Sequence, residues 1–157
     1  RKFEWISLVK NCLFNLMEGK TIILITDVQR EWFCHQICSS INRLETGRPF
    51  LPVFSLKYIF PQIDTLKNDE DIQLLNDLLS LSFKNDYIFW YIGKCDDKRL
   101  KIALSKDDSF LWVFDEEIQN SFTLSSTDEL LDFKLYQLYR MFDKSINAAL
   151  YSEVSFV

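Results

Sequence analysis

Four apolar runs, rich in β-branched and aromatic residues, alternate with helical patterns along the chain. The runs cover residues 21–26, 51–56, 87–92 and 110–114. Such runs, separated by helices, predict a parallel sheet that is buried on both faces. We therefore expect an α/β fold, a three-layer α/β/α sandwich with a doubly wound, mainly parallel sheet of four to five strands. The expected strand order is 2-1-3-4, with a candidate edge strand at residues 121–124.

The helical patterns between the runs fit a single domain of residues 1–157, a length that one hydrophobic core can serve. We expect helices at 3–18, 27–44, from Asn68 or Asp69 onward, from Asp96 or Asp97 to 105, and at 127–151. The helix after Asn68 should bury Ile72, Leu75, Leu78, Leu79 and Ser82. The last helix should bury Leu130, Leu131, Leu138, Met141, Phe142 and Ala149.

Glycine is scarce, which bears on the class of function. The chain has only three glycines, and none belongs to a phosphate-binding loop. Gly19 and Gly47 each follow a helical stretch, as helix C-caps do, and only Gly93 lies at a strand exit. Ligand sites at the carboxyl ends of parallel strands usually need glycine, so that backbone N–H groups can approach a phosphate. We therefore expect no cofactor, and a protein-interaction module rather than an enzyme.

Charge and hydropathy restrict the classes of partner and the cellular location that we expect. The net charge of −5 argues against a direct grip on DNA, which needs a clustered basic face. Action on DNA is therefore expected only through a partner protein. The chain has no apolar run of transmembrane length and no recognisable signal peptide, so we expect a cytoplasmic protein without a membrane contact.

Residues Cys34, His35 and Cys38 raise the question of a metal or catalytic site. Two thiols four residues apart share a helical face, but that face is apolar and His35 points away from it. His35 is the only histidine, and no Gly-x-Ser-x-Gly motif accompanies it. We expect neither a metal site nor a catalytic centre built on His35.

Charged residues and a tryptophan follow the first strand. Asp27, Gln29 and Arg30 either cap the next helix or form a rim that contacts a partner. Trp32 falls on a polar helix face, where it either anchors a partner or lies beneath a loop or another subunit. We assign Asp27, Gln29, Arg30 and Trp32 as candidate partner-binding residues.

The first and last helices carry more apolar surface than one sheet face requires. Apolar residues cover over half of the helical wheel at 3–18, so this helix is expected to meet a second surface, most simply another subunit. Aromatic residues also lie off the core face of the last helix. The candidate subunit-interface residues are Trp5, Val9, Phe133, Tyr136 and Arg140.

Four stretches, in this order and spacing, resemble the HobA family of bacterial replication initiation factors. They are Arg30-Glu31-Trp32-Phe33; residues 76–82 with 90–94; Leu104-Ser105-Lys106 with 109–117; and residues 130–138 with 149–151. They are strings of aromatic and apolar residues rather than a catalytic signature, and they span most of the chain.

This resemblance implies a modified sugar-isomerase (SIS) fold, flavodoxin-like in strand order, that has lost sugar-phosphate binding. It also implies a homotetramer that docks the N-terminal domain of several molecules of the initiator DnaA and helps them assemble at the origin. The alternative is a sugar-phosphate-binding protein or isomerase that uses the crevice at the strand ends. The resemblance transfers no contact residues, so the candidate sites above remain inferences from the residues themselves.

Overall fold

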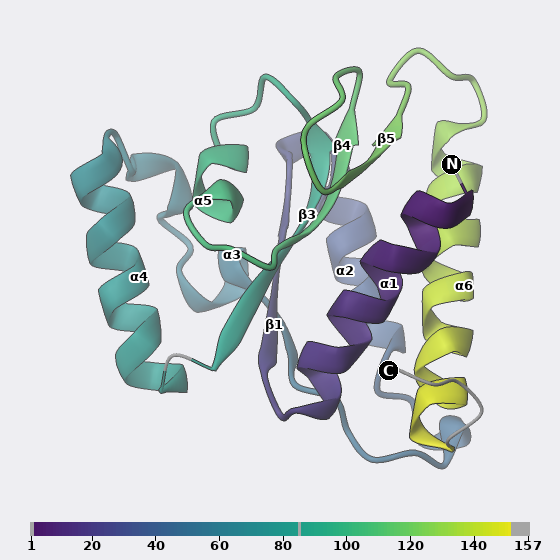
Figure 1. The fold of residues 1–157 in the computed structure, drawn as a ribbon. Coiled ribbons are helices and arrows are strands. Elements are labelled where there is room, and N and C mark those ends of the chain that lie inside the picture. Colours follow the sequence, from purple (N-terminus) through teal and green to yellow (C-terminus); the bar gives the residue numbers. More distant parts are fainter. Residues whose placement is uncertain (1, 85, 152–157) are drawn as a thin grey trace.

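The computed structural model describes residues 2–84 and 86–151 and contains a five-stranded parallel sheet (Figure 1). The strand order is β2-β1-β3-β4-β5. This confirms the predicted α/β class and the predicted order, with the candidate edge strand in the last position. The strands are β1 (Thr21–Thr26), β2 (Val53–Ser55), β3 (Tyr87–Lys94), β4 (Phe110–Phe114) and β5 (Ser121–Leu124).

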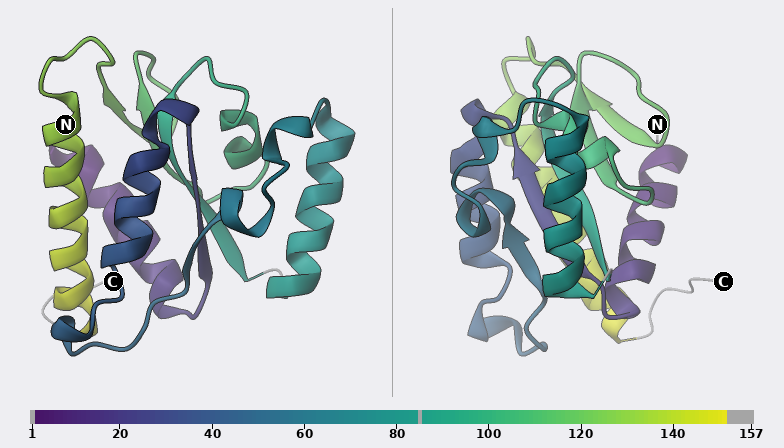
Figure 2. Two further views of the ribbon diagram at one scale, coloured as in Figure 1. Left: turned by 180° about the vertical axis from the view of Figure 1, so that it is seen from behind. Right: turned by 90° about the vertical axis from the view of Figure 1, so that its left-hand side faces the viewer.

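Helices cover both faces of the sheet. They are α1 (Lys2–Met17), α2 (Glu31–Ser40), α3 (Leu56–Ile59), α4 (Asp69–Phe83), α5 (Leu100–Leu104) and α6 (Leu131–Leu150), and single 3₁₀ turns lie at Val28–Arg30, Leu44–Thr46 and Ile63–Thr65. Helices α1, α2 and α6 share one core with the sheet, whereas α3, α4 and α5 contribute to the other. In the right-hand view of Figure 2, α4 lies in front of the sheet and α6 lies behind it.

Strand β3 shows why the sheet needs two helical layers. Its side chains alternate between the two cores: Ile88, Trp90 and Ile92 face one, and Tyr87, Phe89 and Tyr91 face the other. All six are at most 1% exposed. Burial of one large apolar side chain contributes about 1.5–3 kcal/mol. The continuous apolar run, without polar alternation, therefore specifies a central parallel strand.

Three helices are shorter than their sequence patterns predict. Helix α5 begins at Leu100 rather than at Asp96 or Asp97, and α2 and α6 are shortened by side-chain bonds. Helix α2 ends at Ser40 rather than near residue 44, because Asn42 forms two hydrogen bonds with the Leu51 backbone: Nδ2 donates to the carbonyl oxygen (2.8 Å), and Oδ1 accepts from the N–H (2.7 Å). Helix α6 begins at Leu131, because Asp128 accepts the Leu130 N–H at 2.9 Å and holds a turn before the helix. In both cases side-chain bonds to the backbone replace helical ones.

The predicted inner faces of α4 and α6 are partly wrong. Leu78 on α4 is 54% exposed, and Leu130 and Met141 on α6 are 59% and 49% exposed. The buried stripe of α6 instead contains two polar side chains, Tyr139 and Asp143. Counting apolar positions therefore places the centre of this face incorrectly.

The segment that connects β4 to the parallel strand β5 contains no helix. Asp115 and Asn120 at its two ends have φ values of 77° and 60°, in the left-handed region. Aspartate and asparagine tolerate this conformation better than most other residues with a side chain. The two turns let a short segment run back so that β5 starts parallel to β4, with Ser121 paired to Leu111.

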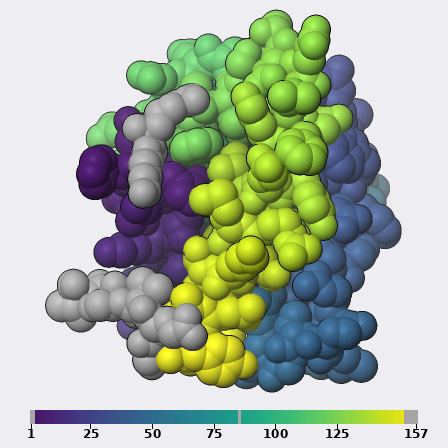
Figure 3. All heavy atoms as spheres, turned by 90° about the vertical axis from the view of Figure 1, so that its right-hand side faces the viewer, coloured from purple at the N-terminus to yellow at the C-terminus, as the bar shows by residue number. Residues whose placement is uncertain are grey.

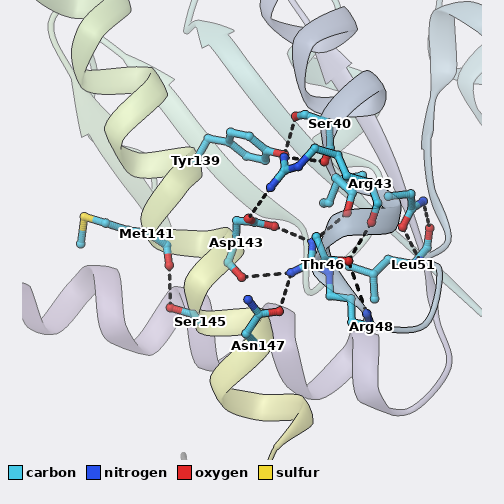
Figure 4. Close-up of polar contacts among 12 residues, drawn as sticks. Ser40, Arg43, Thr46, Arg48, Leu51, Tyr139, Met141, Asp143, Ser145 and Asn147 are labelled. Carbon is cyan, nitrogen blue, oxygen red and sulfur yellow. Dashed lines mark hydrogen bonds and ion pairs between the residues drawn. The ribbon is translucent and has the colours of Figure 1, made fainter.

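A buried polar network fastens α6 to the segment that follows α2 (Figure 4). Arg48 Nη2 lies 2.5 Å from Asp143 Oδ1 and 2.8 Å from the Ile41 carbonyl oxygen, and Arg48 Nη1 donates to Asn147 Oδ1 at 2.9 Å. The Arg48 side chain is 1% exposed and that of Asp143 is 8% exposed. Tyr139 and Ser40 share a further hydrogen bond of 2.7 Å. Because the ion pair is satisfied on several sides, either charge would be left uncompensated if its partner were lost.

We predict that Asp143→Ala lowers the free energy of unfolding by about 3–5 kcal/mol, because it leaves the Arg48 guanidinium buried and unpaired. Urea denaturation measures this loss. The control is Asp132→Ala, an exposed carboxylate on the same helix, for which little change is expected. The double change Arg48→Met with Asp143→Leu should cost less than Asp143→Ala alone. A double variant that is less stable than the single one would contradict an unpaired charge as the cause.

No helix in residues 2–84 and 86–151 is long and apolar enough to cross a bilayer.

Candidate functional site

Asp27 occupies the switch point of the sheet, where the carboxyl ends of β1 and β3 meet. Its Oδ1 accepts the Arg30 N–H and its Oδ2 accepts the Lys94 N–H, both at 3.0 Å. The residue is 2% exposed. The predicted capping role is present, but the same carboxylate also joins the exits of two neighbouring strands. It therefore lies where an α/β protein of this topology ordinarily holds its ligand.

Gly93 leaves the space into which this carboxylate fits. A Cβ at this position would lie 2.9 Å from Asp27 Oδ2 and 2.8 Å from the Tyr91 hydroxyl oxygen. The Tyr91 hydroxyl donates to the Lys94 carbonyl oxygen at 2.7 Å. The glycine at the strand exit thus serves the approach of the protein's own carboxylate.

Arg30 is the positive partner of Asp27 and is itself buried. Its Nη1 lies 3.5 Å from Asp27 Oδ2, and its side chain is 8% exposed. The same Nη1 donates to Gln29 Oε1 at 2.6 Å, and the guanidinium carbon lies 4.8 Å from the centroid of the Phe114 ring. Burial raises the pKa of Asp27, against the effect of its two backbone N–H partners and Arg30. The charged carboxylate therefore costs stability, and this cost is relieved as the pH falls through the raised pKa.

Arg99 closes the space beside the switch point. Its guanidinium makes a bidentate contact with Asp64 at 3.0 and 2.8 Å, and also donates to Glu31 Oε1 at 3.0 Å and to the Thr26 carbonyl oxygen at 2.9 Å. These bonds to Arg99 lower the pKa of Asp64. The cavity left at the ends of β1 and β2 measures about 80 Å³. Sites for small molecules typically measure about 300–1,000 Å³, so the crevice has too little room for a sugar phosphate.

The structure separates the four candidate partner-binding residues into two buried and two accessible ones. Asp27 and Arg30 are 2% and 7% exposed, so their side chains cannot form a contact surface, and the assignment is corrected for them. Both lie inward because the switch point satisfies their charges internally. Gln29 is exposed, and Trp32 is 47% exposed. The two buried residues shape the turn that presents the two exposed ones.

Aromatic residues connect Trp32 with the exposed face of α6. The Trp32 ring contacts Phe33 (centroids 5.4 Å apart), Phe33 contacts Tyr139 (6.3 Å), and Tyr139 contacts Tyr136 (6.5 Å). Phe33 and Tyr139 are buried, whereas Tyr136 is 40% exposed. Figure 3 shows α6 (yellow-green) between α1 (purple) and the blue segment that contains α2. We call Gln29, Trp32, Phe133, Tyr136 and Arg140 the α2–α6 surface.

The candidate subunit-interface residues also divide. Trp5 and Val9 are 7% and 5% exposed, and Trp5 packs against Trp112 and Phe122 of the same chain. Their assignment as interface residues is therefore corrected: they belong to the core of the subunit. Phe133 is 61% exposed, Tyr136 and Arg140 are exposed as well, and Arg140 Nη1 lies 3.5 Å from the Tyr136 hydroxyl.

A second apolar surface, which the sequence analysis missed, lies on the opposite face over α3 and α4. We call it the α4 surface; it consists of Tyr58, Ile59, Leu74, Leu78 and Leu81, which are 43–81% exposed. A groove of about 330 Å³ runs beside it between α3 and α4. The spacing of four and then three residues between Leu74, Leu78 and Leu81 is the seam pattern of a helix that packs on another helix, and it was the available signal.

Cys34, His35 and Cys38 do not come together as ligands. Cys34 is buried, whereas His35 Nδ1 lies 2.9 Å from the Tyr58 hydroxyl and Nε2 lies 3.4 Å from the Ser39 hydroxyl. Within residues 2–84 and 86–151, no group of three or more histidine, cysteine, aspartate or glutamate side chains is arranged to hold a metal ion.

Comparison with known proteins decides the family. The sequence profile of HobA, described as a DNA replication regulator, matches residues 1–156. The chain belongs to the HobA family. The HobA protein of Helicobacter pylori, named a DNA replication regulator, is 32% identical over 156 residues, which cover 97% of this chain and 82% of that protein.

Solved HobA structures agree with this fold. The crystal structure of Helicobacter pylori HobA has a TM-score of 0.82 at 31% identity and covers 97% of this chain and 82% of that one. HobA in a crystal structure of the HobA–DnaA (domain I–II) complex has a TM-score of 0.81 at 30% identity and covers 96% of this chain and 82% of that one. The matches cover 96% and 97% of this chain and therefore extend over both helical layers.

We predict that Gly93→Ala lowers the free energy of unfolding by about 1–3 kcal/mol, because the added methyl group presses on Asp27 and Tyr91. Urea denaturation measures the change. In a Tyr91→Phe background one of the three close contacts of the added methyl group is gone, so the same substitution should cost less. An equal cost in both backgrounds would contradict close contact as the cause.

Proposed function

We propose that this protein is a non-enzymatic adaptor that binds the N-terminal domain of DnaA in the cytoplasm and promotes its oligomerisation at the chromosomal origin. The observation that carries the proposal is the match, over 96% of the chain, to a HobA that was crystallised with DnaA domain I–II. The filled switch point supports the non-enzymatic part, because it leaves a cavity of only about 80 Å³. DNA is reached only through DnaA.

Gln29 and Trp32, at the α2 end of the α2–α6 surface, are our proposed docking site for DnaA. Trp32 is 47% exposed and its ring contacts the buried ring of Phe33 at an interplanar angle of 45°, so its position is restrained before a partner arrives. A large, pre-positioned aromatic side chain loses little entropy on binding, and tryptophan is enriched among residues that dominate interface energies. Gln29, accessible beside it, adds an amide that can both donate and accept hydrogen bonds.

We predict that Trp32→Ala weakens binding of the DnaA N-terminal domain by about 30-fold or more, as measured by calorimetric titration. Trp32→Phe should retain most of the affinity, because an aromatic ring at this position can still contact Phe33. The matched control is Leu44→Ala. It truncates a side chain that is 82% exposed and does not belong to the α2–α6 surface. Equal affinities of native protein and a folded Trp32→Ala variant would place the DnaA contact elsewhere.

We further propose that the protein works as a homotetramer. Several DnaA-binding surfaces in one particle raise the local concentration of DnaA without any new chemistry. A tetramer with two-fold symmetry axes uses two different self-complementary interfaces. The exposed part of α6 around Phe133 is one candidate, and the α4 surface is the other.

Charge supports the pairing of the α4 surface with a second copy of itself. The first turn of α4 carries Asp69, Glu70 and Asp71, and Lys84 caps its other end. In an antiparallel pair of α4 helices, the acidic turn of one copy would face the lysine end of its partner, while Leu74, Leu78 and Leu81 form the seam.

We predict that Leu78→Asp and Phe133→Asp each convert the tetramer into dimers, and that the double variant is monomeric, as measured by sedimentation velocity. A buried aspartate at either interface would lose its hydration without gaining a partner. Leu44→Asp is the control and should leave the mass unchanged. A tetramer that persists in both single variants would remove these surfaces from the interface.

A further inference from the structure

The donors around Asp27 form an arrangement that α/β proteins use to hold anions. One N–H comes from Arg30, in the turn that leads into α2, and the other from Lys94, at the end of the neighbouring strand β3. The Arg30 guanidinium lies 3.5 Å from the same carboxylate. Two backbone donors and one guanidinium thus converge on a single negative group at the switch point.

Two further observations show that this position is built to receive an anion. The missing Cβ of Gly93 leaves space that a carboxylate oxygen fills, since the added atom would lie 2.9 Å from Asp27 Oδ2. Arg30 is 93% buried, as it is only 7% exposed, and its Nε has no hydrogen-bond partner among the described residues. A buried guanidinium requires a negative partner, and here the main chain and the glycine bring one to it.

We propose that the switch point is an oxyanion-binding site whose ligand in this protein is the Asp27 carboxylate, and that a small free oxyanion takes its place when that side chain is removed. Because Asp27 is attached to the chain next to the site, its effective concentration there far exceeds that of a dissolved anion. We therefore expect no phosphate to bind at the switch point of the native protein, although the donors there can bind an oxyanion once the Asp27 carboxylate is removed.

The internal anion also positions the proposed docking site. Asp27 holds the 3₁₀ turn Val28–Arg30 through its bond to the Arg30 N–H, and α2 begins at the next residue, Glu31. Gln29 lies within that turn and Trp32 directly follows it. This second step rests on the proposed function: Asp27 is a positioning residue for DnaA binding, without touching DnaA.

The experiment compares thermal unfolding of native protein and Asp27→Ala in sodium chloride, sodium formate and sodium phosphate at equal ionic strength. In chloride, Asp27→Ala should melt below the native protein. Saturating formate or phosphate should then raise its melting temperature by about 3 °C or more over chloride, because the anion binds only the folded state. The native protein should show only the general stabilisation that phosphate gives to folded proteins, so the rise for Asp27→Ala is counted in excess of the native rise. Equal melting temperatures of Asp27→Ala in all three salts would overturn the proposal.

Three controls keep the test decisive. Asp64→Ala removes a carboxylate whose side chain is 41% exposed, and its partner Arg99 keeps its bonds to Glu31 and to the Thr26 carbonyl oxygen, so formate should add nothing over chloride. Asp27→Asn fills the site with an amide and should not respond to the anions either. If Asp27→Ala is unfolded in chloride, Asp27→Ser is used instead, since its hydroxyl retains the cap on Arg30 and vacates the place beside Lys94. A folded Asp27→Ser that ignores formate would overturn the proposal as well.

Calorimetric titration with the DnaA N-terminal domain tests the positioning role. Asp27→Ala should bind at least about tenfold more weakly in chloride and recover most of its affinity in formate. Recovery of the melting temperature without recovery of affinity would overturn the positioning role and leave the anion site standing. Absence of binding by the native protein would defeat the proposed function, while the thermal test of the anion site would still be decided.

Discussion

Burial of the central strand on both faces is the constraint on which this structure depends. Trp90 on β3 packs against Phe110, Trp112 and Phe142, with ring centroids 5.5, 5.2 and 5.1 Å apart. The neighbouring strands cannot cover either face of β3, so both helical layers must be present before β3 is excluded from water. The outer sides of these layers then carry many of the exposed apolar side chains of the described residues, among them Trp32, Leu78 and Phe133.

Local signals were sufficient to predict most of the framework. The strands β1, β3 and β4 follow from uninterrupted apolar runs, and the start of α4 follows from Asn68, whose side chain accepts the Asp71 N–H at 2.9 Å. The position of Trp32 on a polar helix face was also predictable from its helical neighbours, whereas its 47% exposure, rather than burial beneath a loop, comes from the structure. These features depend on residues within one or two helical turns, which the sequence displays directly.

Features set by distant partners were not predictable in this way. Asp143 looks like an ordinary polar position of α6, and only its pairing with Arg48, 95 residues earlier, makes it part of the buried stripe. The role of Asp27 was half predicted: its cap is local, whereas its bond to Lys94 crosses from one strand exit to another 67 residues away. The α4 surface was missed for the opposite reason, since Leu78 was counted as core and Leu74 and Leu81 were left unassigned, although all three are exposed.

The fastening of α6 has a consequence for how the chain matures during synthesis. Helix α6 supplies Tyr139 and Phe142, which cover Phe33, Trp90 and Phe110. Because α6 lies at residues 131–150, a nascent chain has already made its whole sheet while one aromatic face still lacks its central helix. During that interval one apolar face of the sheet is exposed to other chains. Docking of α6 through Asp143 and Arg48 covers this face. The Asp143–Arg48 ion pair thus holds α6 over an aromatic face that a chain without this helix would expose to other chains.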